Sequence, residues 1–534
     1  MTSGWRLPLA AAAVCIGIAA CGASPAPPPR DVRVVLYHDP SSLSLIGNTD
    51  QNSAQLASMI SDGLVSYDAA GRYVPMVAKS WDLAPDGKTL TFHLREGVVW
   101  HDGQPVTAKD VAFTVAKIRD PATQAQSWAG YFADVTSLET PDDATVIVHY
   151  ARTYADALEP WRAPLIPEHV AGKDSDFLTG GFARHPVGCG PFRFASYAPG
   201  QSVVLQAFNR YWEGAPKVGR IIVRIVGAER TGYEALLLGD VDLMAVTPDL
   251  WRESQSSTAG TRFARFVYYR LNAWKVDWNQ TNAVPYFRDP RIRRALVLAL
   301  DREKFAATVI GGLGRPAASS YPPESPWSDP SILPLPYDPV SSASLLEESG
   351  WRLPHGKRVR EKDGKPFTFT LLLAAGSQEM ADRIAAWMQQ SLAPVGVDMK
   401  IEKVEWKTFQ QRRKTHDFQA AMAGVSFDPT PDQYDLYHTS AAEGGFNYGG
   451  FSDAEVDRLL EEGRSTVDPT ARHQIYNRLQ QRLREVEPMA FLFQLAQPVL
   501  RDPRLEGVEA SPVGLFQFAP GPRAWHWSEA GTGR

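Results

Sequence analysis

Cysteine is nearly absent from this chain of 534 residues, which has only Cys15, Cys21 and Cys189. Cys15 lies in an apolar N-terminal segment typical of a cleaved signal, and Cys21 follows that segment directly. A mature body with Cys189 as its only thiol cannot form an internal disulfide, so hydrophobic cores must hold the fold together. Cys189 stands among the turn residues of 187–191, where a buried thiol is expected rather than a nucleophile.

Concentrated charge and long apolar runs are also missing. The formal net charge is −5, and the Lys and Arg residues are scattered along the chain. This distribution provides no basic surface for nucleic acid. No apolar run of 18 residues occurs, so no transmembrane helix is expected in the mature protein. At 44% hydrophobic residues, the chain can nevertheless bury several cores.

Motifs of common enzymes are lacking too. The sequence has no G-x-S-x-G and no H-E-x-x-H, and Asp82 stands where a phosphate loop ending in Gly87-Lys88-Thr89 would need glycine. Its eleven histidines do not have the close spacing along the chain that is typical of metal ligands. We therefore expect a protein that is not an enzyme, with no catalytic residues, no metal site and no cofactor.

The N-terminus has the pattern of an export signal. Arg6 precedes an apolar run at 7–20 that is too short to span a bilayer. Residues 18–21 (IAAC) resemble the lipobox of bacterial lipoproteins, in which the cysteine is acylated. We expect a lipoprotein signal peptide at 1–20, lipidation of Cys21 and a Pro-rich tether at 21–30. The alternative is an ordinary signal peptide with a chance cysteine at its end.

A strand followed by a capped helix is predicted in the segment 89–118. Apolar residues alternate with polar ones over 89–95, and 98–100 (VVW) reads as a second short strand. Thr107 and Asp110 then have the spacing of a capping box. His101 and Asp102 are adjacent in the intervening turn, and adjacency does not assemble a catalytic pair, so a turn is predicted here.

The same alternation continues along the chain and indicates an α/β fold. Strands are expected at 146–150, 203–205 and 221–226. A helix is expected after Asp289-Pro290, and another after a capping box formed by Ser452 and Glu455.

Several segments resemble the family 5 extracellular solute-binding proteins, the substrate-capturing subunits of peptide, nickel and related ABC importers. The likeness extends from about residue 32 to 522. The matching segments stand in the family's order: 75–111 (PMVAKSWDLAPDGKTLTFHLREGVVWHDGQPVTAKDV), 186–192 (PVGCGPF), 209–216 (NRYWEGAP), 239–243 (GDVDL), 287–302 (FRDPRIRRALVLALDR), 337–351 (YDPVSSASLLEESGW) and 446–460 (FNYGGFSDAEVDRLL).

The resemblance implies a two-lobed, periplasmic-binding-protein-like α/β fold of the large class II type. An extra domain is inserted in lobe one, and a ligand crevice lies between the lobes. The implied boundaries are lobe one at 31–70, 187–270 and 496–528, the inserted domain at 71–186, and lobe two at 271–495.

The resemblance also implies a function and a site. The protein would be the substrate-binding lipoprotein of an ABC importer, a monomer held by lipid at the outer face of the bacterial cytoplasmic membrane. It would capture di- or oligopeptides by hinge closure and deliver them to a permease with its ATPase. Asp428, four residues after Gly424, matches the carboxylate that grips the ligand's α-ammonium. Phe427, Trp274 and Tyr448 lie in segments expected to contact the ligand.

Some features leave alternatives open. Asp428 precedes Pro429 and could simply cap a turn. Met422 stands where some oligopeptide binders have an arginine for the ligand carboxylate, and Val425 replaces a tryptophan often found near the ligand. An aromatic crevice without a charged anchor would favour an oligosaccharide, and converging histidines would favour nickel or another metal complex. A nucleophile beside a base would favour a lipid-anchored enzyme or a signalling scaffold on the same fold.

Overall fold

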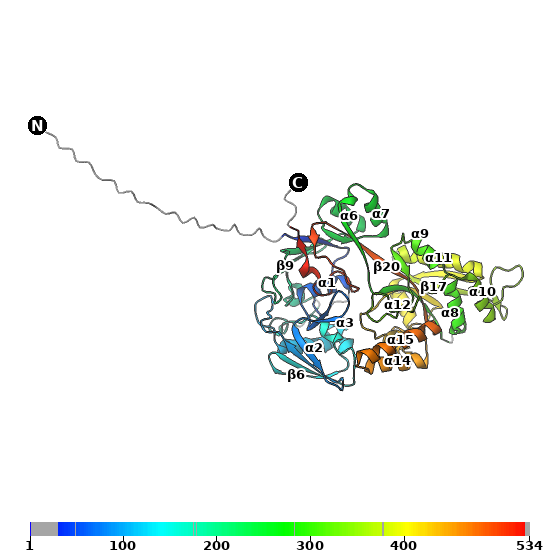
Figure 1. The fold of residues 1–534 in the computed structure, drawn as a ribbon, viewed down its shortest axis with the longest axis horizontal. Coiled ribbons are helices and arrows are strands. Elements are labelled where there is room, and N and C mark those ends of the chain that lie inside the picture. Colours follow the sequence, from blue (N-terminus) through cyan, green and yellow to red (C-terminus); the bar gives the residue numbers. More distant parts are fainter. Residues whose placement is uncertain are drawn as a thin grey trace.

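The computed structural model describes residues 1, 30–47, 50–174, 176–177, 179–281, 284–375 and 379–528. Cys21 and most of the predicted signal peptide and tether lie outside these ranges. Figure 1 shows two bodies side by side. The two ends of the main described region lie close together, because Trp527 Nε1 donates a hydrogen bond to the Asp31 carbonyl at 3.1 Å. Among the described helices, none is both long and apolar enough to cross a membrane.

A mixed sheet of twelve strands extends through both bodies. Its main path has the order β18-β17-β19-β13-β20-β11-β1-β10-β9-β8, and β12 and β14 also pair with β20. Its strands are β1 (Val32–Leu36), β8 (Phe192–Ala198), β9 (Ser202–Ala207), β10 (Arg220–Ile225), β11 (Leu243–Ala245), β12 (Ala264–Tyr269), β13 (Asn272–Trp278), β14 (Gly314–Pro316), β17 (Thr368–Ala374), β18 (Asp398–Val404), β19 (Ala420–Ser426) and β20 (Met489–Arg501).

Strand β20 joins the two bodies. Its first part pairs with β13 and with β14, where Leu495 lies opposite Gly314. From Ala496, which lies opposite Tyr269, it pairs with β12 and then β11. We call the body containing β1 and β8 to β12 lobe one, and the body containing β13, β14 and β17 to β19 lobe two. The chain also crosses between the lobes where β12 leads into β13.

A separate four-stranded sheet of order β4-β5-β7-β6 forms the inserted domain of lobe one, together with helices α2 to α5. Its strands are β4 (Ala78–Leu83), β5 (Thr89–Leu94), β6 (Val135–Asp142) and β7 (Thr145–Tyr150). The predicted strand at 89–95 is confirmed, as is the capping box of Thr107 and Asp110. The second strand predicted at 98–100 is wrong. The tight turn after it leaves room for a single bridge, between Val99 and Pro105.

Helices cover both sheets, and three small two-stranded ladders complete the fold. The helices are α1 (Gln51–Ile60), α2 (Ala108–Arg119), α3 (Gln126–Ala129), α4 (Glu168–Ala171), α5 (Gly181–Arg184), α6 (Glu229–Leu238), α7 (Pro248–Ser256), α8 (Pro290–Leu298), α9 (Arg302–Thr308), α10 (Pro339–Glu348), α11 (Glu379–Leu392), α12 (Trp406–Lys414), α13 (Tyr434–Tyr437), α14 (Ala454–Ser465) and α15 (Pro469–Val486). The ladders are β2 (Val65–Tyr67) with β3 (Tyr73–Pro75), β15 (Glu361–Lys362) with β16 (Lys365–Pro366), and β21 (Leu505–Glu506) with β22 (His526–Trp527).

Capping residues set where two predicted helices begin. Asp289 caps α8, as the sequence predicts, by accepting a bond from the Arg291 amide. The predicted capping box at Ser452 and Glu455 is displaced by one residue. Asp453 caps α14 instead and accepts a bond from the Val456 amide, because its carboxylate is the stronger acceptor for the free amides of the first turn.

One core spans lobe one and its inserted domain, and separate cores fill lobe two. Cys189 lies in the first of these cores, and burial raises its thiol pKa to about 12, so the thiol is inert as predicted. His101 is also structural, since its Nδ1 accepts from the Gly188 amide at 3.2 Å. Burial lowers the pKa of His101 to about 4. The HDG segment is therefore a turn, as predicted.

Candidate ligand-binding site between the lobes

The two chain segments that cross between the lobes lie against each other. Arg270 and Leu271 connect β12 to β13, and the buried Gln494 of β20 donates its side-chain Nε2 to the Arg270 carbonyl at 2.8 Å. The Leu271 amide donates to the Pro512 carbonyl at 3.0 Å. Both bonds engage backbone groups of the crossing segment itself, so the crossing is held in place independently of the side chains on the facing lobe surfaces.

Beside this junction, β13 and β19 turn one face outward. Trp274 lies opposite Gly424, and Asn272 lies opposite Ser426. Opposed residues in an antiparallel pair point to the same face, so these four share one side. Gly424 and Ser426 are exposed, and Asn272 and Trp274 are half-buried. On this side, a ligand can therefore reach the backbone of β19 at Gly424 and Ser426 together with the ring of Trp274.

Asp428 lies where this face meets lobe one. Its Oδ2 accepts a hydrogen bond from the Tyr131 hydroxyl at 3.0 Å, and Tyr131 belongs to a short 3₁₀ helix of the inserted domain (Gly130–Phe132). Pro429 lies against Gly71 of lobe one, where an added Cβ would be 3.2 Å from the proline ring. Asp428 therefore stands on lobe two and contacts lobe one through Tyr131.

A buried acid and a cation stand close to Asp428 on the lobe one side. Glu159 forms an ion pair with Arg162 and accepts hydrogen bonds from Tyr67 and, at 2.7 Å, from Tyr73. The Arg162 guanidinium lies 4.0 Å from the centre of the Tyr67 ring. Burial raises the pKa of Glu159, while the Arg162 charge opposes that rise.

The charges of this cluster do not balance. Arg162 is already paired with Glu159, and Asp428 forms no ion pair with any residue of the described ranges. One negative charge therefore remains uncompensated at a point where the lobes meet. Burial and the charge of Asp428 together raise the pKa of Tyr131, so its hydroxyl remains a donor. The cluster can therefore accept a further cation at Asp428.

The other predicted ligand residues occupy different environments. Phe427 is half-buried and packs against Phe491, with ring centroids 6.3 Å apart. Tyr448 is only 7% exposed and lies in a lobe-two core. The Arg413 guanidinium covers its ring at 3.9 Å. The structure brings Trp274, Phe427 and Asp428 to the lobe junction and places Tyr448 beneath the surface of lobe two.

Sequence reasoning missed several residues at or near this site. Tyr131, Glu159 and Arg162 come from the inserted domain, and only the fold brings them to Asp428. An aromatic run with Trp128 and Tyr131 after a predicted helix was the one local signal.

The lobes also touch far from the chain crossings. Arg472 of α15 binds Asp156 of the inserted domain through two hydrogen bonds, one of them 2.9 Å from Nη1 to Oδ1. Both residues are buried, with 5% and 3% of their surfaces accessible. The Ala155 amide donates to the Arg464 carbonyl at 2.8 Å. Figure 1 shows α14 and α15 beside the inserted domain along this edge. We call this set of bonds the distal contact.

A pocket of about 100 Å³ adjoins the cluster within lobe one, and Trp128 and Arg162 form part of its wall. It reaches inward to Asp62, which accepts bonds from the Tyr211 hydroxyl at 2.8 Å and from Trp212. Burial raises the pKa of Asp62 to about 6. This pocket is separate from the face of β13 and β19.

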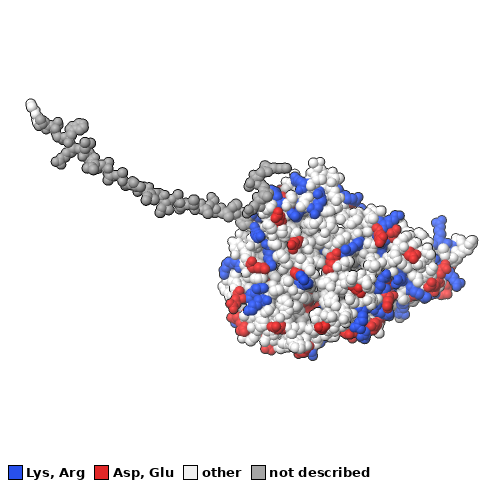
Figure 2. All heavy atoms as spheres, viewed as in Figure 1, with Lys and Arg blue, Asp and Glu red and all other residues white. Residues whose placement is uncertain are grey.

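The described residues provide little basis for metal binding or for a polyanionic ligand. In the ranges given above, no group of three or more His, Cys, Asp or Glu side chains is arranged to hold a metal ion. Figure 2 shows basic and acidic residues intermingled on the visible face, with no large area of one sign. The arrangement at the junction suits a modest ligand with a positive group.

Several known proteins resemble this chain over most of their length. The oligopeptide-binding protein AppA of Bacillus subtilis is 28% identical over 496 residues, which cover 90% of this chain and 89% of AppA. Protein XP55 of Streptomyces lividans is 31% identical over 458 residues, which cover 85% of this chain and 81% of XP55. The nickel-binding periplasmic protein of Escherichia coli is 24% identical over 471 residues, which cover 85% of this chain and 87% of that protein. Two of these three relatives are named as binding proteins, AppA for oligopeptides and the Escherichia coli protein for nickel.

The solved structure of Bacillus subtilis AppA in complex with a nonapeptide has the same fold. It matches with a TM-score of 0.76 at 25% identity and covers 94% of this chain and all of that chain. The predicted two-lobed α/β fold is thus confirmed. The family model of the bacterial extracellular solute-binding proteins, family 5 (middle region), matches residues 72–447, well over half of the chain. The protein therefore belongs to family 5 of the bacterial extracellular solute-binding proteins.

Proposed function

We propose that this protein is the substrate-binding lipoprotein of an ABC importer and that it captures peptides outside the cytoplasm. The peptide's α-ammonium binds Asp428, and the closed protein presents the peptide to a permease with its ATPase. The relative named as oligopeptide-binding and the peptide-bound structure of AppA support this choice of ligand. Lipid on Cys21 holds the protein, as a monomer, at the outer face of the cytoplasmic membrane.

The observation that carries the proposal is the unpaired carboxylate of Asp428 at the lobe junction. It bonds Tyr131 of the inserted domain while it stands on lobe two, so a cation there interacts with both lobes at once. A ligand that contacts both lobes favours the closed arrangement by its differential affinity for that arrangement. The hinge then lies at the two crossings, which corresponds to lobe boundaries near 270/271 and 495/496.

The outward face of β13 and β19 provides the remaining contacts. Exposed strand backbone at Gly424 and Ser426 suits strand-like hydrogen bonding to a peptide, which tolerates varied side chains. Trp274 and Phe427 flank that backbone and contact the ligand's apolar atoms. Tyr448 lies beneath Arg413, which is paired with Asp277, so Tyr448 supports the lobe-two side of the site from below.

One calorimetric experiment tests the proposal. Trialanine and N-acetyl-trialanine are titrated into the wild type and into Asp428→Asn. We expect free trialanine to lose roughly 30-fold or more in affinity on the substitution, because a desolvated charge pair is broken. The acetylated peptide should bind the wild type weakly and lose little more. Equal losses for both peptides, together with a lower melting temperature, would show that Asp428 only caps the turn before Pro429.

A further inference from the structure

Glu159 has a fully occupied carboxylate inside the inserted domain. One of its oxygens accepts from the hydroxyls of Tyr67 and, at 2.7 Å, Tyr73, and the other accepts from Arg162. Only 2% of its side chain is exposed, against 19% for the side chain of Arg162. A ligand in the crevice therefore does not reach Glu159, and any influence of Glu159 on binding acts through Arg162.

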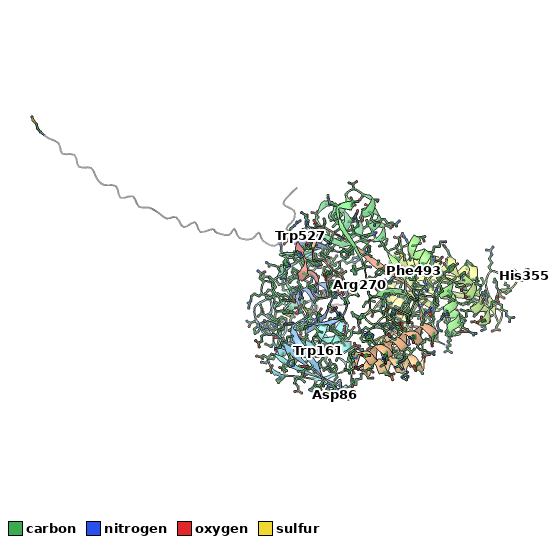
Figure 3. All side chains as sticks on the ribbon, viewed as in Figure 1. Asp86, Trp161, Arg270, His355, Phe493 and Trp527 are labelled. Atoms are coloured by element: carbon green, nitrogen blue, oxygen red, sulfur yellow. The ribbon has the colours of Figure 1, made fainter. Side chains whose placement is uncertain are left out.

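The ion pair of Glu159 and Arg162 forms within one short helix. Both residues belong to the 3₁₀ helix Glu159–Arg162, in which side chains three residues apart lie directly above one another. Figure 3 shows where this helix lies, because the labelled Trp161 is its third residue. Trp161 is buried and donates its Nε1 to the Tyr150 hydroxyl at 2.9 Å, which fixes the helix. The pair is therefore complete within the inserted domain, whatever the position of lobe two.

The same helix packs against the residues that hold Asp428. The ring centroid of Trp161 lies 5.4 Å from that of Phe132, the neighbour of the tyrosine that donates to Asp428. Burial lowers the pKa of Arg162, and the surrounding acidic groups, Glu159 foremost and Asp428 among them, more than reverse that effect. Among the described residues, Arg162 forms an ion pair with Glu159 alone. Arg162 is therefore within electrostatic reach of two carboxylates and is paired with one of them.

We propose that Glu159 is a positioning residue that keeps Asp428 available to a cation, because it holds Arg162 in an ion pair and so prevents Arg162 from neutralising Asp428. Without the Glu159 charge, Asp428 is the anion left within reach of the guanidinium, and charge-assisted bonding turns the guanidinium toward it. The two charges then cancel, and an incoming ammonium group meets no net negative charge. The inference rests on the proposed function and deepens it, since a residue that the ligand does not touch sets the sign of the site.

Calorimetry with trialanine and N-acetyl-trialanine tests this role through the ratio of the two affinities. Glu159→Gln keeps an acceptor for the tyrosine hydroxyls and removes the charge, so we expect the preference for free trialanine to fall by roughly tenfold or more. Glu159→Asp keeps the charge on a shorter side chain and should retain most of the preference. Glu159→Gln combined with Arg162→Met removes both charges and should restore it. Glu213→Gln is the matched control, because it removes the acidic partner of Arg523, another arginine of the same pocket wall, and should leave the preference unchanged.

Two results would overturn the proposal and leave the proposed function intact. They are an unchanged preference in Glu159→Gln and a fall that the added Arg162→Met does not reverse. A wild type that binds both peptides equally would contradict the proposed role of Asp428 and this inference with it. If Glu159→Gln does not fold, Arg162→Met alone decides. It leaves Glu159 without its cation, so the preference at pH 8 should rise roughly threefold or more, and an equal or lower preference would overturn the proposal.

Discussion

The lobes meet in two regions of different construction. At the junction, covalent chain and backbone hydrogen bonds connect them, through Arg270, Leu271 and the continuous strand β20. At the distal contact, a buried side-chain ion pair between Asp156 and Arg472 does so. The first kind of connection survives rotation of one lobe against the other, and the second must break. The junction therefore sets the axis of motion, and the distal contact sets the free energy needed to open.

The largest effect on the arrangement of the lobes should come from removing one partner of the ion pair at the distal contact. Arg472→Met leaves Asp156 buried without its cation, which costs about 3–5 kcal/mol. Water can reach Asp156 only if the lobes part, so we expect a larger radius of gyration in small-angle scattering of the unliganded protein. We also expect weaker peptide binding, because more of the free protein is open.

Two controls accompany this variant. Arg482→Met removes an ion pair of the same helix whose partner, Asp453, belongs to lobe two, so the radius should not change. The double variant Asp156→Leu with Arg472→Met replaces both charges by apolar groups and should restore much of the compact form. An unchanged radius for Arg472→Met alone would show that this ion pair does not govern opening.

A somewhat smaller effect, on the free energy of unfolding, is expected when the pH changes. It comes from Asp62, which lies on the lobe-one side of the junction. Burial raises the pKa of Asp62 from 3.8 to about 6. A carboxyl whose pKa rises on folding stabilises the folded state while it is protonated, and it loses that contribution as the pH rises from about 4 to about 6. The free energy of unfolding should fall by roughly 3 kcal/mol over this range through this group. Denaturant titrations of the wild type and Asp62→Asn should differ in this slope. Parallel curves would contradict the prediction.

The smallest effect should follow from Tyr131→Phe at the junction. The substitution removes the single hydrogen bond to Asp428 and leaves the ring in place. We expect a loss of about 1 kcal/mol in peptide binding, roughly fivefold in affinity by calorimetry. Tyr37→Phe is the matched control, because its hydroxyl makes a bond of equal length, 3.0 Å, to the Ala245 carbonyl inside lobe one. A similar loss in both variants would indicate a general effect on stability.

Local patterns in the sequence predicted local structure. Alternation located β5, and the spacing of Thr107 and Asp110 located the start of α2. The same spacing rule predicts a cap at Ser452 where Asp453 caps α14, because two acceptors stand side by side and the spacing rule does not weigh a carboxylate against a hydroxyl. Family resemblance, and not residue spacing alone, supplied the two-lobed fold and the choice of Asp428.

Contacts between distant residues could not be predicted in this way. Asp156 and Arg472 are 316 residues apart, and Tyr131 and Asp428 are 297 apart. Neither pair produces a periodic pattern in the sequence, because the two partners of each pair meet only after both lobes have folded.

Strand β20 has a consequence for the order in which the protein is made. It spans 13 residues near the end of the chain, yet it is an inner strand of the sheet in both lobes. A polypeptide that leaves the ribosome N-terminus first cannot complete the lobe-two half of that sheet until residue 495 has emerged, or the lobe-one half until residue 501 has emerged. Both lobes therefore mature late and nearly together, with long-range pairing as their slow step. During synthesis, the gap beside β11 and the gap beside β13 stay open as unpaired edges.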